Sequence, residues 1–227
     1  MLFSFFSGSS ADGGFDHIVS KSVAMLADAR HSFDLATLAV LTDADATTVA
    51  LDVRDTDERI NLAEQELRRE LIVHVTVRGS SDIGSVLGFT LLLKKIERIG
   101  DQAKNILELA EHGVTLAYSP EIESLLSGRQ RVSSLFAEAG ELLAATDGDE
   151  GAVRDFTDLA ETIADEYRSK IEEFMTSDLP GRDVVPLAFY YRYLRRIVAN
   201  LVGVLRDSTG PISRTADSIG ETADLDD

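Results

Sequence analysis

Two carboxylates lie at helical spacing in the segment IERIGDQAKNIL, residues 96–107. Glu97 and Asp101 are four residues apart, which places both side chains on one stripe of a helix. Like charges at this spacing destabilise a helix by a few tenths of a kcal/mol. A cation shared by the two carboxylates would remove this repulsion, so the spacing indicates a metal site.

A second polar stripe lies upstream, in the segment DERINLAEQE. A short turn between the two helices would make them antiparallel neighbours, so that Asp57 and Asn61 face the first stripe. Carboxylate and amide oxygens suit hard or borderline cations. We therefore expect one divalent or iron-type metal ion, with Fe, Zn, Mn or Mg as candidates, at Asp57, Asn61, Glu97 and Asp101.

A surface explanation of the same carboxylates is also open. In that case Glu97 and Asp101 form ordinary ion pairs within one helix, and such pairs contribute little stability. Their candidate partners are Lys94, Arg98 and Lys104. The residues alone do not decide between the metal site and the surface pairs.

Residues for other kinds of site chemistry are absent or scattered. The chain has no Cys, so thiolate ligands and nucleophiles are excluded. Di-iron carboxylate bundles need Glu three residues before His on two helices, and no Glu stands in that position here. The four His show no ligand-like spacing: His17, His31, His74 and His112. We therefore expect no catalytic residues and no enzymatic activity.

Helical periodicity dominates the elements that must position these residues. We expect six helices, at about 15–42, 45–77, 82–112, 120–145, 150–175 and 184–207. Val73, Val75 and Val77 have strand-like propensity, but they continue a strong helical pattern, so we assign them to a helix. Ser119 is the expected cap of the fourth helix, and Gly113 the expected end of the third.

The helices form two groups of three. When the sequence is aligned with itself at an offset of 98 residues, the apolar residues Ile96 and Ile99 correspond to Leu194 and Ile197. We therefore expect an all-α fold of two tandem three-helix bundles, which places the first repeat at 15–113 and the second, divergent repeat at 118–207. A flexible N-terminal lead (1–14) and an acidic, disordered tail (208–227) flank them.

The net charge of −18 argues against nucleic acid as a partner, because affinity there comes from neutralising phosphates. No run of 18 apolar residues exists, so we expect no membrane span. Phe3, Phe5 and Phe6 leave open a peripheral membrane contact at the N-terminus.

A family resemblance rests on the two segments that carry the polar stripes. IERIGDQAKNILELAE resembles the signature of the PhoU family, which runs roughly L-E-R-I-G-D-x-A-x-N-I-A-E, and DERINLAEQE resembles the second-helix motif of that family. The resemblance covers about residues 15–207, but the second half matches in hydrophobic frame and length only. Arg195 and Ala199 stand where the second repeat should carry its carboxylates.

The resemblance implies two three-helix bundles side by side and metal bound through paired E(D)xxxD motifs. It carries the ligand role over to the first repeat alone, at Asp57, Asn61, Glu97 and Asp101. It also implies a cytoplasmic regulatory adaptor in phosphate homeostasis that contacts a phosphate transporter component or a sensor kinase. We further expect a homodimer. The alternatives are a metal-free helical scaffold or dimer with an unknown partner, and a metal-dependent enzyme on a helical bundle.

Overall fold

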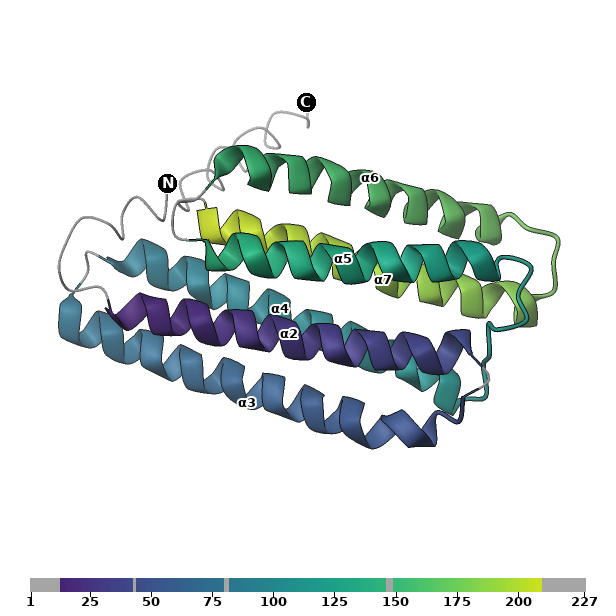
Figure 1. The fold of residues 1–227 in the computed structure, drawn as a ribbon, viewed down its shortest axis with the longest axis horizontal. Helices are drawn as coiled ribbons and strands as arrows, with labels where there is room; N and C mark the ends of the chain where they lie inside the picture. Colours follow the sequence, from purple (N-terminus) through teal and green to yellow (C-terminus); the bar gives the residue numbers. More distant parts are fainter. Residues whose placement is uncertain (1–12, 43, 80–81, 146–148, 210–227) are drawn as a thin grey trace, which may run out of the picture.

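The structure, a computed structural model, describes residues 13–42, 44–79, 82–145 and 149–209. It contains six long helices within these ranges (Figure 1). They are α2 (Gly13–Leu41), α3 (Thr47–Arg78), α4 (Ile83–Glu111), α5 (Ile122–Ala144), α6 (Glu150–Met175) and α7 (Gly181–Thr209). The expected all-α fold is confirmed over the described part of the chain. Most of the predicted lead and tail, residues 1–12 and 210–227, lies outside the described ranges.

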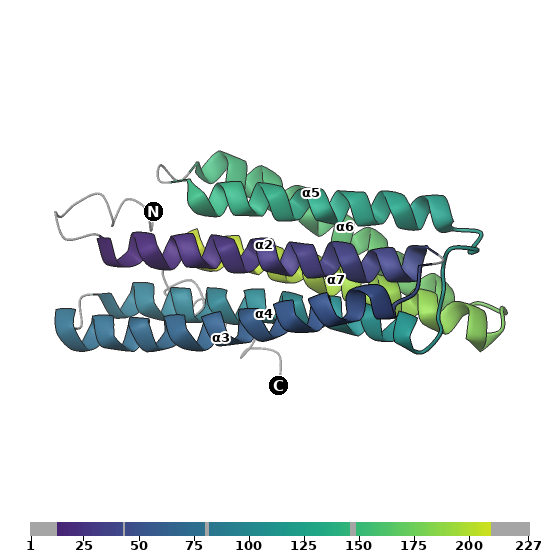
Figure 2. The same ribbon diagram turned by 60° about the horizontal axis from the view of Figure 1, so that its bottom comes forward.

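The helices run along one long axis in two groups of three. Figures 1 and 2 show α2, α3 and α4 on one side and α5, α6 and α7 on the other. The groups meet where α4 packs on α7 and α2 packs on α5. Phe33 of α2 and Phe136 of α5 join the two groups, with ring centroids 5.5 Å apart. Buried side chains from all six helices therefore form one connected core.

The repeat deduced from the hydrophobic frame matches the pattern of burial. Ile96 and Leu194, which are 98 residues apart, are both fully buried, as are Ile99 and Ile197. An apolar residue at every third or fourth position gives each helix one inward face. The shared frame therefore directs corresponding faces of α4 and α7 into the core.

The end of α4 and the start of α6 follow local sequence signals. Gly113 follows α4 with a φ of 81°, a backbone conformation that glycine adopts without strain. Its N–H donates to the carbonyl oxygen of Ala110 at 2.9 Å. Asp149 caps α6, because its Oδ1 accepts from the N–H groups of Gly151 and Ala152 at 2.9 and 3.1 Å.

The starts of α5 and α7 differ from those expected. Ser119 does not cap α5; its Oγ accepts the N–H of Glu121 at 3.2 Å in a local turn, and the helix starts at Ile122. Helix α7 begins at Gly181, which leaves Pro186 inside the helix. Pro186 is the sixth residue of the helix, beyond the first four N–H groups that have no partner within a helix in any case, so it costs one backbone hydrogen bond.

No described helix is both long and apolar enough to cross a membrane.

Two buried tyrosines in the second repeat differ in the hydrogen bonding of their hydroxyl groups, and this difference should affect stability. The hydroxyl of Tyr167 donates to the carbonyl oxygen of Gly128 at 3.1 Å, whereas the buried hydroxyl of Tyr190 has no hydrogen-bond partner in the described structure. Tyr167→Phe should lower the free energy of unfolding by about 1 kcal/mol, and Tyr190→Phe should leave it unchanged or raise it by about the same amount. Denaturant unfolding of both variants checks this, and a loss at Tyr190 as large as that at Tyr167 would contradict it.

Candidate functional site

The two predicted stripes meet along the α3–α4 seam. Gly100 makes the close approach possible, because a Cβ atom there would lie 3.2 Å from Ile60 Cδ1 and 3.7 Å from Asp57 Oδ1. Asn61 lies one turn along α3 from Asp57, and its Nδ2 is 3.5 Å from Asp57 Oδ2. The structure therefore brings the second-helix residues against the signature segment of α4, as the sequence predicts.

A lysine of α4 links the two helices across this seam. The ammonium Nζ of Lys104 lies 2.9 Å from Asp57 Oδ2 on α3 and 3.6 Å from Asp101 Oδ1 on α4. The side chain of Asp57 is only 14% exposed, whereas that of Lys104 is 33% exposed. One cation of the chain therefore contacts two of the predicted metal ligands at once.

The third carboxylate has its own cation. Glu97 Oε1 lies 2.6 Å from Lys94 Nζ, one turn away on the same helix. Its second oxygen, Oε2, is buried and has no hydrogen-bond partner in the described structure. Further along the seam, buried Glu64 lies 2.8 Å from Arg68 Nη2. Each acidic side chain of the seam therefore lies beside a basic one.

The charges along the seam act on one another. Burial raises the pKa of Asp101, and the neighbouring carboxylates of Glu97 and Asp57 raise it further, while Lys104 and Lys94 oppose this effect. Burial by itself would lower the pKa of Lys104, but its hydrogen bond to Asp57 and the nearby negative charges raise it overall. The predicted ligands are thus near enough for mutual repulsion, and Lys104 is held in its charged form.

These residues, as arranged, do not fit a metal ion. Metal–oxygen distances in carboxylate sites are about 2.0–2.6 Å, and the ammonium of Lys104 lies where an ion shared by Asp57 and Asp101 would have to approach. No group of three His, Asp or Glu side chains in the described ranges is arranged to hold an ion. The intrahelical pairs foreseen as the surface explanation are present, since Glu97 pairs with Lys94 and Asp101 with Lys104. The metal binding predicted from the sequence is itself untested.

The second repeat has no counterpart of this seam. Arg195 and Ala199, at the positions that correspond to Glu97 and Asp101, are both exposed on α7. Each of the four His lies beside a polar group. These groups belong to Glu70, Asp52, Asp82 and the backbone carbonyl of Glu108.

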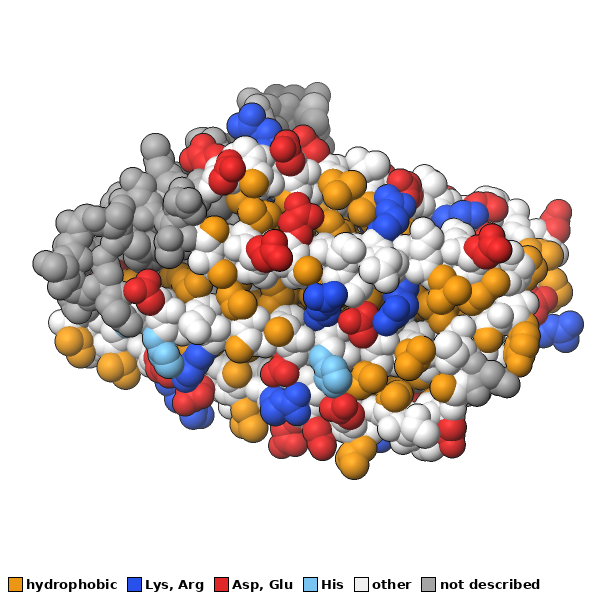
Figure 3. All heavy atoms as spheres, viewed as in Figure 1, with side chains coloured by type: hydrophobic (Ala, Val, Ile, Leu, Met, Phe, Trp, Pro, Cys, Tyr) orange, Lys and Arg blue, Asp and Glu red, His pale blue; other side chains and the backbone are white. Residues whose placement is uncertain are grey.

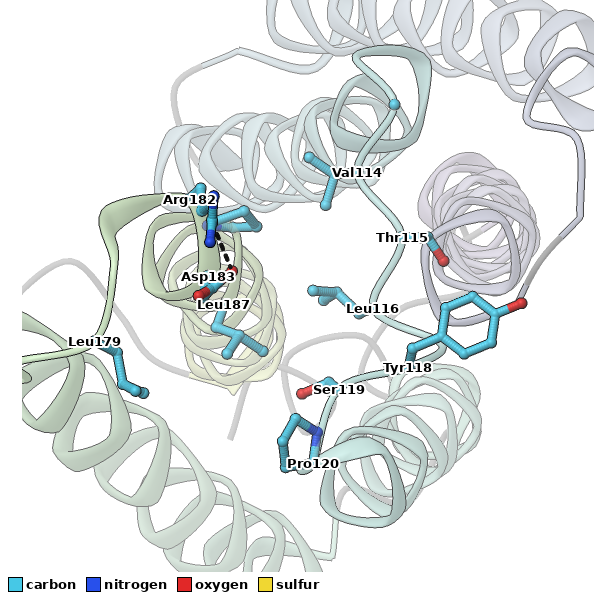
Figure 4. Close-up of a pocket in the computed structure, with 12 residues that line it drawn as sticks. Val114, Thr115, Leu116, Tyr118, Ser119, Pro120, Leu179, Arg182, Asp183 and Leu187 are labelled. Atoms are coloured by element: carbon cyan, nitrogen blue, oxygen red, sulfur yellow. Dashed lines mark ion pairs between the residues drawn. The ribbon is translucent and has the colours of Figure 1, made fainter.

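A pocket of about 510 Å³ lies at the end of the molecule where the segment between α4 and α5 passes the start of α7 (Figure 4). Leu116 and Leu187 lie on opposite sides of it, while the ring of Tyr118 points away. Its charged residues are Arg182 and Asp183, which pair with each other at 3.6 Å. The lining is mainly apolar and offers contact surface rather than catalytic groups.

A second pocket, of about 440 Å³, lies between α5 and α6. Its basic residues are already paired: Arg131 with Glu166, and Lys170 with Glu173 at 3.1 Å. Neither pocket therefore presents a free charge to a ligand.

Across the face that α2, α3 and α5 present in Figure 3, acidic and basic side chains are interspersed with hydrophobic ones.

Comparison with known proteins shows similarity both in sequence and in fold. The sequence model of the PhoU domain family matches residues 23–110, a range that contains most of α2, all of α3, nearly all of α4 and the α3–α4 seam. Residues 23–110 are a PhoU domain. The fold resembles the crystal structure of PhoU from Pseudomonas aeruginosa, with a TM-score of 0.71 and 21% identity. That match covers 90% of this chain and 98% of the other.

No curated protein sequence matches the chain. The PhoU domain contains Asp57, Asn61, Glu97 and Asp101, whereas α5, α6 and α7 lie outside the matched range.

The part of the site that the sequence did not predict is the contact of Lys104 with Asp57 on α3. Because Lys104 lies three residues after Asp101, the spacing predicted an ion pair between them within α4. The spacing gave no sign of the contact between Lys104 and Asp57.

Proposed function

We propose that this chain is a regulator in phosphate homeostasis that acts by contact with another protein, either a phosphate transporter component or a sensor kinase. The match of residues 23–110 to the PhoU domain is the observation that carries this proposal. The similarity of fold to a PhoU structure over most of both chains supports it. PhoU proteins are regulatory, and on this likeness we infer a non-enzymatic adaptor in the cytoplasm.

Deletion of the gene in its host tests the role. We expect a change in the rate of phosphate uptake and in the response to phosphate starvation, restored by a plasmid copy of the gene. An increase would mean that the protein restrains uptake, and a decrease that it supports uptake. Unchanged uptake and starvation response at both high and low phosphate would reject the proposal.

Exposed apolar side chains on α4 support action by contact. Ile83, Leu87 and Leu91 follow at intervals of four residues, which places them on one stripe of the helix. They are 43%, 46% and 52% exposed, although apolar side chains of this size are usually buried. Contiguous apolar surface of this kind marks protein contact sites.

The double variant Leu87→Asp/Leu91→Asp tests this stripe. We expect it to weaken binding to the purified transporter ATPase subunit or sensor kinase about tenfold or more, because charges would enter an apolar contact. Leu159→Asp is the matched control, since Leu159 is 48% exposed but lies on α6. Surface plasmon resonance measures both variants, and equal affinities for the double variant and the parent would place the contact elsewhere.

The homodimer remains a prediction. Light scattering should give a mass of about twice the 24.7 kDa of one chain. A monomer at micromolar concentration would remove the dimer from the proposal and leave the regulatory role standing.

A further inference from the structure

We propose that the ammonium group of Lys104 is the resident cation of the α3–α4 seam, so that the first repeat is held together without a bound metal ion. The seam has the composition of a cation site: Asp57, Glu97 and Asp101 approach one another on two helices. Lys104 supplies a cation from the chain itself, and it contacts one carboxylate on each helix.

The contact across the seam distinguishes Lys104 from an ordinary helix-surface lysine. A pair with Asp101 alone would stay within α4, but the shorter distance, 2.9 Å, joins Lys104 to Asp57 on α3. This ion pair is at the same time a hydrogen bond that Lys104 Nζ donates to Asp57 Oδ2. An ammonium group has three donors, which allows it to serve carboxylates on both helices.

A metal ion and this ammonium group exclude each other. An ion bound to Asp57 Oδ2 at about 2.0–2.6 Å would have to share that oxygen with a positive Nζ only 2.9 Å from it. The two cations would also repel each other in partly buried surroundings, where charges are weakly screened. Metal binding at Asp57 and Asp101 therefore requires that Lys104 leave the seam.

Removal of the charge of Lys104 should expose a latent metal site. Asp57 and Asp101 would lose their shared cation, and Glu97 Oε2, which is buried without a hydrogen-bond partner, lies on the same seam. Lys104→Met keeps much of the aliphatic stem but carries no charge. Lys94 would still pair with Glu97, but Asp57 and Asp101 would then repel each other unless a divalent cation entered.

Lys170 provides the matched control in the second repeat. Its Nζ also contacts two carboxylates, Glu121 and Glu173, each at 3.1 Å, and its side chain is 34% exposed against 33% for Lys104. Lys170→Met removes the same charge from a similar setting, but one outside the acidic seam. Lys104→Arg is the rescue variant, since it restores a positive charge at the original position.

Calorimetric titration of chelator-treated, untagged protein with Mn²⁺ tests the proposal, with thermal unfolding as a second readout. We expect no saturable binding to the parent chain, to Lys170→Met or to Lys104→Arg. Lys104→Met should bind one Mn²⁺ per chain, and its Tm should rise by about 5 °C or more when Mn²⁺ exceeds Kd a hundredfold.

Stoichiometric Mn²⁺ binding by the parent chain that is lost in Glu97→Ala/Asp101→Ala would overturn the proposal and support the metal prediction instead. Failure of a folded Lys104→Met to bind Mn²⁺ more tightly than Lys170→Met would also overturn it. The parent chain needs no substitution, so that part of the test holds even if a variant does not fold. None of these outcomes depends on the regulatory role, which the deletion experiment tests separately.

Discussion

Phe33→Ala should lower the free energy of unfolding by about 3–5 kcal/mol, the usual cost of emptying a buried phenylalanine site. Phe33 is fully buried on α2, and its ring contacts that of Phe136 on α5. Because this contact joins the two groups of helices, we expect both groups to lose stability together. Urea unfolding followed by circular dichroism, and by hydrogen exchange in each group, measures the effect.

Phe189→Ala is the control for this loss. Phe189 stacks on Tyr193 at 5.9 Å, but it is 43% exposed, so its truncation should cost about 1 kcal/mol or less. A second, separate unfolding transition in Phe33→Ala, with α5, α6 and α7 unaffected, would contradict the single connected core. It would show that the two groups fold as independent units.

Gly100→Leu should have the second-largest effect, a loss of about 1–3 kcal/mol from overpacking. A Cβ atom at Gly100 would already lie 3.2 Å from Ile60 Cδ1, and the remaining carbons of a leucine would force α3 away from α4. We also expect the contact between Lys104 and Asp57 to be lost. Thermal unfolding measures the first effect, and the nitrogen-15 chemical shift of the Lys104 ammonium group, in the parent and in the variant, reports the second.

Gly84→Leu is the matched control on the same helix. Gly84 is exposed, and a Cβ atom there would meet nothing within 4 Å. Since glycine inside a helix costs about 1 kcal/mol relative to good helix formers, this variant should be as stable as the parent or slightly more so. Equal losses at Gly84 and Gly100 would mean that the close approach of α3 and α4 is not what constrains position 100.

The mutual position of the two acidic stripes could be predicted from short-range pattern alone. Asp57 and Asn61 lie on one stripe of α3, and Glu97 and Asp101 on one stripe of α4, because residues four apart share a helix face. The turn between the helices is short, so the two stripes had to meet. What the stripes hold could not be predicted in this way, because carboxylates in one place attract either a metal ion or a basic side chain.

The sequence by itself determined the helices and their inward faces. Apolar residues at helical spacing fix which side of each helix is buried, and Gly113 and Asp149 mark helix ends through local backbone chemistry. Only the tertiary structure decided the reach of Lys104. A lysine side chain is long and flexible, so its partner depends on which helix lies across the seam and how closely it approaches. That distance is set where Gly100 packs against Ile60, close to Asp57. Gly100 and Ile60 are 40 residues apart in the sequence.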